Sequence, residues 1–308
     1  MDNSLDLFPE CCGKGSKNWG MPYMGSKNDI AWQIVHAMPK AETFVDLFCG
    51  GCAITHAAMV SGRWKRFIIN DVKPTANIFF KAINGDLKEY ERFVSRAEFF
   101  KTDDLCIKIL WSFGNDCKSY LWNADKEKLK GYAVRMLTEK TLKQRREAWM
   151  AFVAELKTQI GYEMLKEGNF NRIQSLESLE RLQSLQSLER LQSLQSLERL
   201  QSLQSLEGDY RAVEIPENAV VYCDIPYKGT SDYGTDFDHD AFYAWFESLK
   251  CPAFLSEYNA PFTLVAEFAK RKKRGNPSTM KDNGMGSVTE RLYFNGSLDD
   301  YKQLMNGE

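Results

Sequence analysis

The 308-residue sequence lacks the features that mark several classes of protein. Its charge is nearly balanced, with 40 basic and 42 acidic residues, so it has no overall positive charge for nucleic acid and any basic surface must be local. No stretch approaches the length of a membrane span. Residues 1–8 contain neither a basic start nor an apolar run of signal-peptide length. We therefore expect a cytoplasmic protein with no membrane partner.

The sequence also gives little indication of disulfides or of a metal site. Its eight cysteines show neither zinc-ribbon spacing nor the density of a secreted disulfide-rich domain, so reduced thiols are expected. Cys49-Gly-Gly-Cys52 has the spacing of a redox pair, but it lies in a glycine turn that is interpreted below. The three histidines, His36, His56 and His239, lie outside the motifs described below, and no metal is expected.

What the sequence does contain is enough apolar material, 44% of residues, for a substantial core. Three β-branched or aromatic runs predict buried parallel strands: 43–47, 66–70 and 219–223. Helical segments follow, one over 53–61 and one after Pro74, and this alternation indicates a doubly wound α/β sheet. Further along, Asp238 can cap a helix through Leu249, 253–256 reads as a strand, and 262–268 with 289–294 can form an antiparallel edge hairpin.

The middle of the chain differs from this pattern. Residues 86–173 are rich in helix formers, charges and tryptophans, and the stretch is too long for an ordinary crossover between two strands. We predict an inserted helical subdomain there. The sheet domain would then be built from residues 1–85 and 208–308, with a leucine-rich repeat over 174–207 between the insert and the second part.

That repeat is built on the nine-residue unit Gln-Ser-Leu-Gln-Ser-Leu-Glu-Arg-Leu. Leucine falls at every third position from Leu176 to Leu206. On an α-helix each such step falls about 60° short of a full turn, so the leucines would spiral around the helix. A 3₁₀ helix would align them, but long 3₁₀ runs are uncommon. We expect a helical or irregular linker that arose by duplication and tolerates changes of length.

The first motif with chemical content follows the first predicted strand. Asp46 and Phe48 precede the turn Cys49-Gly50-Gly51-Cys52, which opens a helix. Glycine lets backbone pass close to a ligand, and a helix N-terminus directs N–H groups at it. At the end of the next strand, Asp71 is placed to accept ribose hydroxyls. The pattern is compatible with a nucleoside site, although similar turns are often purely structural.

The second motif is Asp224-Ile225-Pro226-Tyr227, at the end of another apolar strand. An adenine amine is a poor nucleophile because its lone pair is delocalised into the ring. The Asp224 carboxylate and the Ile225 carbonyl could accept its two hydrogens as a methyl group arrives. Tyr227 could stack on a base taken out of the duplex. An aspartate turn with proline is the structural alternative.

A third motif, Met21-Pro-Tyr23-Met-Gly25-Ser26-Lys27, precedes an amphipathic helix and does not fit the Walker pattern. Its lysine can contact a carboxylate or a phosphate. Ser26 could alternatively cap the helix.

In this order the three motifs resemble the Dam-type family of DNA adenine-N6 methyltransferases, over roughly residues 21–295. The resemblance implies a Rossmann-like fold in which S-adenosylmethionine is converted to S-adenosylhomocysteine, with double-stranded DNA as substrate. It also allows a cognate restriction endonuclease as a partner. For the methyl donor it implies a site formed by Asp46, Phe48, Gly50 and Asp71, flanked by Tyr23 and Lys27 and, on a weaker match, by Asp209. It also implies a catalytic loop formed by Asp224, Ile225, Pro226 and Tyr227.

Two positions depart from the family pattern. Cys52 replaces the second glycine of the turn, with Gly51 one place earlier, which suggests a shifted turn. Ile225 replaces the first proline of the catalytic loop, so the carbonyl acceptor is kept while rigidity is lost. We predict retained activity, at a reduced rate or at the full one.

Two regions could supply local positive charge or polar contacts for DNA. One is the basic run Lys270, Arg271, Lys272, Lys273 and Arg274, for which a solvated loop is the alternative. The other is the helical insert, which the resemblance assigns to target recognition. The candidates there are Asn115, Lys118, Tyr120, Arg145 and Arg146.

Other functions remain compatible with these motifs. An N4-cytosine methyltransferase would use the same loop chemistry, although Asp224 favours adenine. An RNA or glutamine methyltransferase is disfavoured by the long insert. A DNA- and donor-binding homologue that has lost catalysis is suggested by Cys52 and Ile225. A structural repeat protein is disfavoured because the repeat is a small part of the chain.

Overall fold

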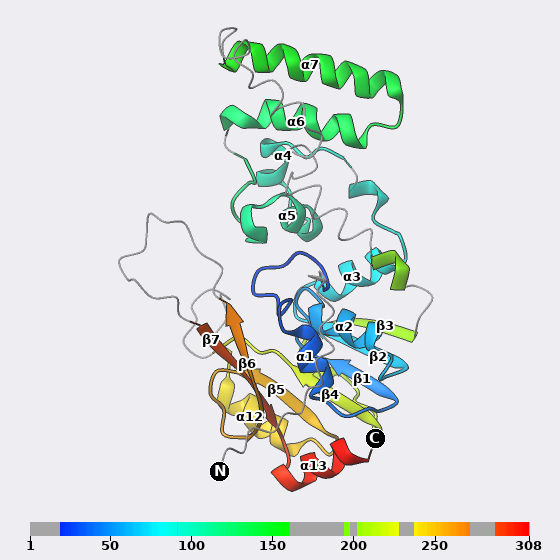
Figure 1. The fold of residues 1–308 in the computed structure, drawn as a ribbon, viewed down its shortest axis with the longest axis vertical. Coiled ribbons are helices and arrows are strands. Elements are labelled where there is room, and N and C mark those ends of the chain that lie inside the picture. The colour runs from blue at the N-terminus through cyan, green and yellow to red at the C-terminus, as the bar shows by residue number, and fades with distance from the viewer. Residues whose placement is uncertain are drawn as a thin grey trace, which may run out of the picture.

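The fold is centred on a seven-stranded sheet, seen in a computed structural model that describes residues 19–90, 92–122, 124–160, 194–197, 202–227, 237–271 and 287–307 (Figure 1). The strand order is β3-β2-β1-β4-β5-β7-β6. The strands are β1 (Thr43–Asp46), β2 (Arg66–Asp71), β3 (Ser202–Glu207), β4 (Ala219–Cys223), β5 (Ala253–Glu257), β6 (Thr263–Arg271) and β7 (Ser287–Phe294). Strands β3, β2, β1, β4 and β5 are parallel, and β7 runs antiparallel to both β5 and β6. The predicted Rossmann-like α/β fold is confirmed.

Helices cover both faces of the sheet and define two hydrophobic cores. Side chains alternate along β1, so Phe44 packs into one core and Val45 into the other. The first core contains α1 (Ala31–His36), α2 (Ala53–Ser61), α3 (Thr75–Ile83) and Tyr301 of α13 (Leu298–Asn306). The second core is closed by Phe242 and Phe246 of α12 (His239–Ser248).

Most of the predicted sheet elements are confirmed. The predicted strands correspond to β1, β2, β4 and β5, and the edge hairpin to β6 and β7. Asp238 caps α12 as expected, because its carboxylate accepts the N–H of Ala241 at 2.9 Å. Ser26 is not the cap of α1, since that position belongs to Ile30.

The end of the leucine repeat is a strand, so the expectation of a helical or irregular linker is wrong for residues 202–207. Strand β3 pairs in parallel with β2 at the edge of the sheet, with Leu206 opposite Asn70. Just beyond it, Gly208 adopts φ 153°, and its N–H donates to the backbone carbonyl of Asp71 at 3.0 Å. The same tetrapeptide Leu-Gln-Ser-Leu forms a 3₁₀ helix, η3, over Leu194–Leu197. The preceding copies, in 174–193, lie outside the described residues.

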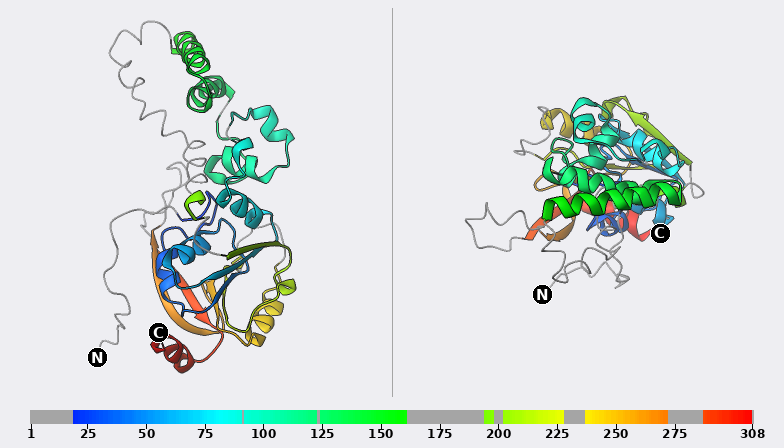
Figure 2. Two further views of the ribbon diagram at one scale, coloured as in Figure 1. Left: turned by 90° about the vertical axis from the view of Figure 1, so that its right-hand side faces the viewer. Right: turned by 90° about the horizontal axis from the view of Figure 1, so that it is seen from above.

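Helices between α3 and β3 form a separate group at one end of the long axis, with the sheet toward the other (Figures 1 and 2). They are α4 (Arg96–Lys101), α5 (Leu105–Trp111), α6 (Ala124–Thr138) and α7 (Leu142–Ile160), with short 3₁₀ turns η1 (Lys88–Tyr90) and η2 (Phe113–Asn115). Ser95 and Asp104 cap α4 and α5. No helix in the described ranges is long and apolar enough to cross a membrane.

Candidate active site

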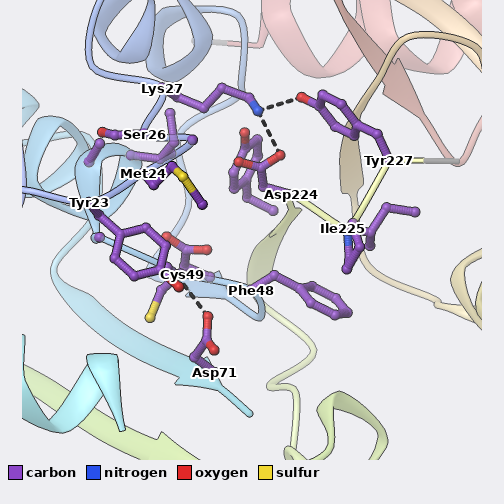
Figure 3. Close-up of a pocket in the computed structure, with 18 of the residues that line it drawn as sticks. Tyr23, Met24, Ser26, Lys27, Phe48, Cys49, Asp71, Asp224, Ile225 and Tyr227 are labelled. Carbon is purple, nitrogen blue, oxygen red and sulfur yellow. Dashed lines mark hydrogen bonds and ion pairs between the residues drawn. The ribbon is translucent and has the colours of Figure 1, made fainter. Parts of the chain in front are cut away.

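A cavity of about 390 Å³ opens where the strand order reverses, at the carboxyl ends of β1 and β4 (Figure 3). This is the position at which open α/β sheets bind ligands. Side chains from the N-terminal segment, the turn after β1 and the loop after β4 face one another across it. Its lining includes the predicted residues Tyr23, Lys27, Asp46, Phe48, Gly50, Asp71, Asp224, Ile225, Pro226 and Tyr227.

The glycine turn after β1 packs tightly beneath Tyr23. A Cβ on Gly51 would lie 2.5 Å from the Cβ of Tyr23, so the residue there has to be glycine. Gly50 and Cys52 have φ of 48° and 55°, and Cys52 is the N-cap of α2. Cys52 therefore occupies a left-handed position, which suits the glycine that the family pattern expects and costs a side-chain-bearing residue about 1 kcal/mol. The backbone strain in this turn lies at Cys52.

Asp46 is a buried carboxyl group that lacks one hydrogen-bond partner. It is 1% exposed; Oδ2 accepts the Thr55 hydroxyl at 2.6 Å, and Oδ1 has no partner. Burial raises the pKa of Asp46 to about 7, and the negative charges of Asp224 and Asp71 add to the effect of burial, while hydrogen bonds from the Thr55 hydroxyl and the Phe48 backbone act in the opposite direction. A cation in the cavity would hold this carboxyl group ionised.

Asp71 connects the ends of β1 and β2. Its carboxylate accepts the N–H of Gly50 at 2.8 Å and the N–H of Lys73 at 2.9 Å. Burial raises the pKa of Asp71, and the two backbone N–H groups act in the opposite direction. The carboxylate therefore fixes the glycine turn while it lines the cavity.

Elsewhere in the cavity Lys27 points at Asp224 and Tyr227 (Figure 3), and a second carboxylate is also within ion-pair distance of its ammonium. Its ammonium, 5% exposed, donates to Asp224 Oδ1 at 2.8 Å and to the hydroxyl of Tyr227. The second carboxylate belongs to Glu290 of β7, whose Oε1 lies 3.3 Å from Lys27 Nζ and accepts the Tyr227 hydroxyl. Burial lowers the pKa of Lys27, but the charges of Asp224 and Glu290 outweigh burial and raise it overall.

Neighbouring residues hold the loop after β4. Ile225 is 2% exposed and packs into the second core, which restrains the loop without proline. The Pro226 carbonyl and His239 Nε2 are 2.9 Å apart, and Tyr258 packs edge-on against Tyr227 with ring centroids 4.5 Å apart.

Sequence reasoning missed Glu290, Tyr258 and His239 as neighbours of this loop. The signal in the sequence was the charged pair Glu290-Arg291 within the predicted strand 289–294. Alternation along a strand indicates that one member faces inward, but not which one.

Other predicted residues lie away from the cavity. Asp209 caps the 3₁₀ turn η4 (Tyr210–Ala212) and pairs with Arg211, whose hydrogen bonds lower the Asp209 pKa to about 2. In the insert, the Tyr120 hydroxyl donates to the Val94 carbonyl at 2.7 Å and the ring is buried. Asn115 donates to the Ile109 carbonyl.

The predicted basic DNA contacts are mostly surface residues or lie beyond the described chain. Lys118, Arg145 and Arg146 are exposed. Lys270 and Arg271 end β6, and 272–274 lie outside the described residues. A DNA-binding role for these residues stays a prediction.

Comparison with known proteins gives one family match. A model of the D12 class N6 adenine-specific DNA methyltransferase family matches residues 23–271. No curated protein matches the chain. Among solved structures, the chain is similar to the rRNA methyltransferase aviRa from Streptomyces viridochromogenes, at 14% sequence identity and a TM-score of 0.34, over 98% of this chain and 96% of that one.

Proposed function

Because the chain belongs to the D12 class N6 adenine-specific DNA methyltransferase family, we propose that it transfers a methyl group from S-adenosylmethionine to N6 of adenine at a specific site in double-stranded DNA. S-adenosylhomocysteine is the second product. The observation that carries the proposal is one cavity lined by both Asp46 and Asp224. A cytoplasmic location, near the DNA substrate, belongs to the same proposal.

The residues around Asp46 fit the methyl donor. S-adenosylmethionine supplies an electrophilic methyl group on a sulfonium and also carries an ammonium group. Asp46 offers the ammonium a buried carboxylate oxygen that has no partner. Gly50 and Gly51 line the cavity and let the turn pack closely against Tyr23, and Asp71 can accept ribose hydroxyls from the same lining. None of these roles uses a metal.

Asp224 and the Ile225 carbonyl would accept the two hydrogens of the adenine amine, which favours an sp³ nitrogen as the methyl group arrives. Reaching them requires a base flipped out of the duplex, and Tyr227 would stack on it. Lys27 Nζ lies 4.6 Å from the centre of the Tyr227 ring and bonds Asp224. The incoming adenine amine would compete with this ammonium for Asp224 Oδ1.

The rate enhancement would come from positioning and from acceptors fixed before the reaction. Before the base arrives Asp224 is held by Lys27, and Ile225 is held throughout by core packing. Holding both reactants in one cavity makes the transfer effectively unimolecular. Fixed acceptors stabilise the charge that develops on the amine without reorganisation. Direct transfer needs no covalent intermediate.

DNA would be held by the helical insert and by the basic run 270–274. Lys118, Arg145 and Arg146 are exposed and would contact phosphates, Arg145 through the guanidinium N–H groups that remain when its Nε donates to the Glu139 carbonyl. Asn115 and Tyr120 are engaged with backbone carbonyls, so in this conformation they support the insert. Family membership favours adenine over cytosine N4 as the acceptor.

The experiment replaces Asp224 with Asn and measures transfer of labelled methyl groups to DNA. The amide keeps the shape and one acceptor but removes the negative charge, so we expect a rate loss of at least about 100-fold with unchanged donor binding. The matched control is Asp299→Asn on α13, whose side chain is 87% exposed. Parental rates in Asp224→Asn would overturn the assignment of the catalytic loop.

A further inference from the structure

We propose that Glu290 is a positioning residue that receives the Lys27 ammonium when the substrate amine takes Asp224. Its role is to make the catalytic carboxylate available. This inference rests on the proposed function and adds to it a residue outside the range matched by the family model, 23–271.

The geometry gives Lys27 two counter-ions at almost equal range. Its Nζ lies 2.8 Å from Asp224 Oδ1 and 3.3 Å from Glu290 Oε1. The ammonium is therefore within ion-pair distance of both carboxylates at once. Glu290 is 1% exposed, so it offers the ammonium a partner that is inside the protein and cannot be replaced by bulk water.

Strand β7 explains why Glu290 points at the cavity. Glu290, Leu292 and Phe294 alternate along the same face of β7, and Leu292 and Phe294 pack in the first core. Because β7 runs antiparallel to β5, its first half lies at the edge where the parallel strands end. Glu290 therefore lies at the carboxyl ends of the parallel strands, on the same side of the sheet as Asp224.

The charge argument favours an exchange over simple displacement. A buried ammonium that loses its only counter-ion is strongly destabilised. If Asp224 were the sole partner, adenine binding would have to oppose that full penalty. With Glu290 present the ammonium remains paired. The free-energy cost of releasing Asp224 from the ammonium is then only the difference in free energy between the Lys27–Asp224 and Lys27–Glu290 ion pairs.

A purely structural role for Glu290 is the alternative, since Glu290 also accepts the Tyr227 hydroxyl. The two roles differ in what they require. Holding Tyr227 needs an oxygen acceptor of the right length, which glutamine supplies. Receiving Lys27 needs a negative charge, which aspartate supplies and glutamine does not.

The first experiment therefore compares Glu290→Gln with Glu290→Asp in steady-state methyl transfer to DNA. We expect Glu290→Gln to lower kcat/KM for DNA about tenfold or more, with the dissociation constant of S-adenosylhomocysteine within about twofold of the parent. Glu290→Asp should be the faster of the two. The reverse order, or parental activity in Glu290→Gln, would overturn the inference. Glu267→Gln, on exposed β6, is the matched control.

A second experiment places Glu290→Gln in a Lys27→Met background. Without the lysine, the buried carboxylate of Glu290 and the partly exposed carboxylate of Asp224 lose the cation that pairs with both, and their negative charges repel each other. Removing the second carboxylate should then leave the rate unchanged or raise it. An equal loss in both backgrounds would indicate a structural role and contradict the inference.

The two hypotheses fail in different ways. A parent protein that forms no N6-methyladenine would overturn the proposed function and, with it, the role of Glu290. A parent that methylates adenine while Glu290→Gln behaves like the control would leave the function standing and remove only the exchange.

Discussion

Replacing Asp46 with Asn should stabilise the ligand-free protein while weakening donor binding. The wild-type carboxyl group is 1% exposed, and one of its oxygens has no partner. Burial raises its pKa from the ordinary 3.8 to about 7, so the folded state resists ionisation of this group. The contribution of Asp46 to the free energy of unfolding is therefore fully present below pH 3.8, where the group is protonated in both the folded and the unfolded state. It is lost as the pH rises through about 7.

The magnitude follows from the two pKa values. From the proton-linkage relation, the free energy of unfolding falls by about 2 kcal/mol at pH 5 and by about 4 kcal/mol at pH 8, compared with a side chain that does not titrate. Asparagine avoids this loss, keeps an oxygen for the Thr55 hydroxyl and fits the same space. Denaturant unfolding of both proteins at pH 5 and pH 8 measures the difference. An Asp46→Asn protein that is less stable than the parent at pH 8, or a gap that is the same at both pH values, would refute the reasoning.

The binding half of the prediction uses the same variant. An amide cannot pair with the donor's ammonium as a carboxylate does, so S-adenosylhomocysteine should bind about tenfold more weakly or worse, as measured by calorimetry. A folded Asp46→Asn protein with parental affinity would remove Asp46 from the donor site.

Three further predictions concern other parts of the chain. Ile225→Pro should be at least as fast as the parent in methyl transfer, because proline stiffens a loop whose carbonyl is already the acceptor; a slower variant would contradict this role for Ile225. Replacing all five basic residues of 270–274 with alanine should reduce the salt dependence of DNA binding, by up to about 4.5 in the slope of log K against log salt, and an unchanged slope would exclude phosphate contact there. Deleting 183–191 leaves the two described repeat copies intact and should preserve activity and melting temperature, whereas loss of either would make the repeat's length essential.

The sequence predicts the centre of the sheet because its strands are buried on both faces. Runs such as 219–223 are continuously apolar, and β4 is buried throughout. The acidic residues that end these runs, Asp46, Asp71 and Asp224, meet in one cavity because carboxyl ends of neighbouring parallel strands share an edge. For these elements, local pattern and tertiary structure agree.

The edge strand β3 could not be predicted, since identical residues adopt two structures. Leu-Gln-Ser-Leu is a 3₁₀ helix at Leu194–Leu197 and part of a strand at Leu203–Leu206. What differs is the context: the strand pairs with β2 and is followed by Gly208, where the other complete copies have arginine. The carbonyl of Gly208 accepts the Asn70 amide at 3.0 Å, in a backbone conformation that suits glycine. Tertiary pairing thus decides the structure of the repeat.

The side chains around Lys27 show a similar limit to prediction. The predicted strand 289–294 includes Glu290, but only the pairing of β7 with β5 and β6 determines that Glu290 faces Lys27. Conversely, Asp209 lies in the expected stretch of sequence but turns toward Arg211. Side-chain direction at loop and edge positions depends on register, which a single sequence leaves open.

The central claim is the identity of the methylated atom. Purified protein is incubated with labelled S-adenosylmethionine and unmethylated double-stranded DNA, and the DNA is then digested and its nucleosides separated. We predict that the label appears in N6-methyladenine and is lost with Asp224→Asn. Label in N4-methylcytosine, or no labelled nucleoside from a protein that binds S-adenosylhomocysteine, would contradict the claim.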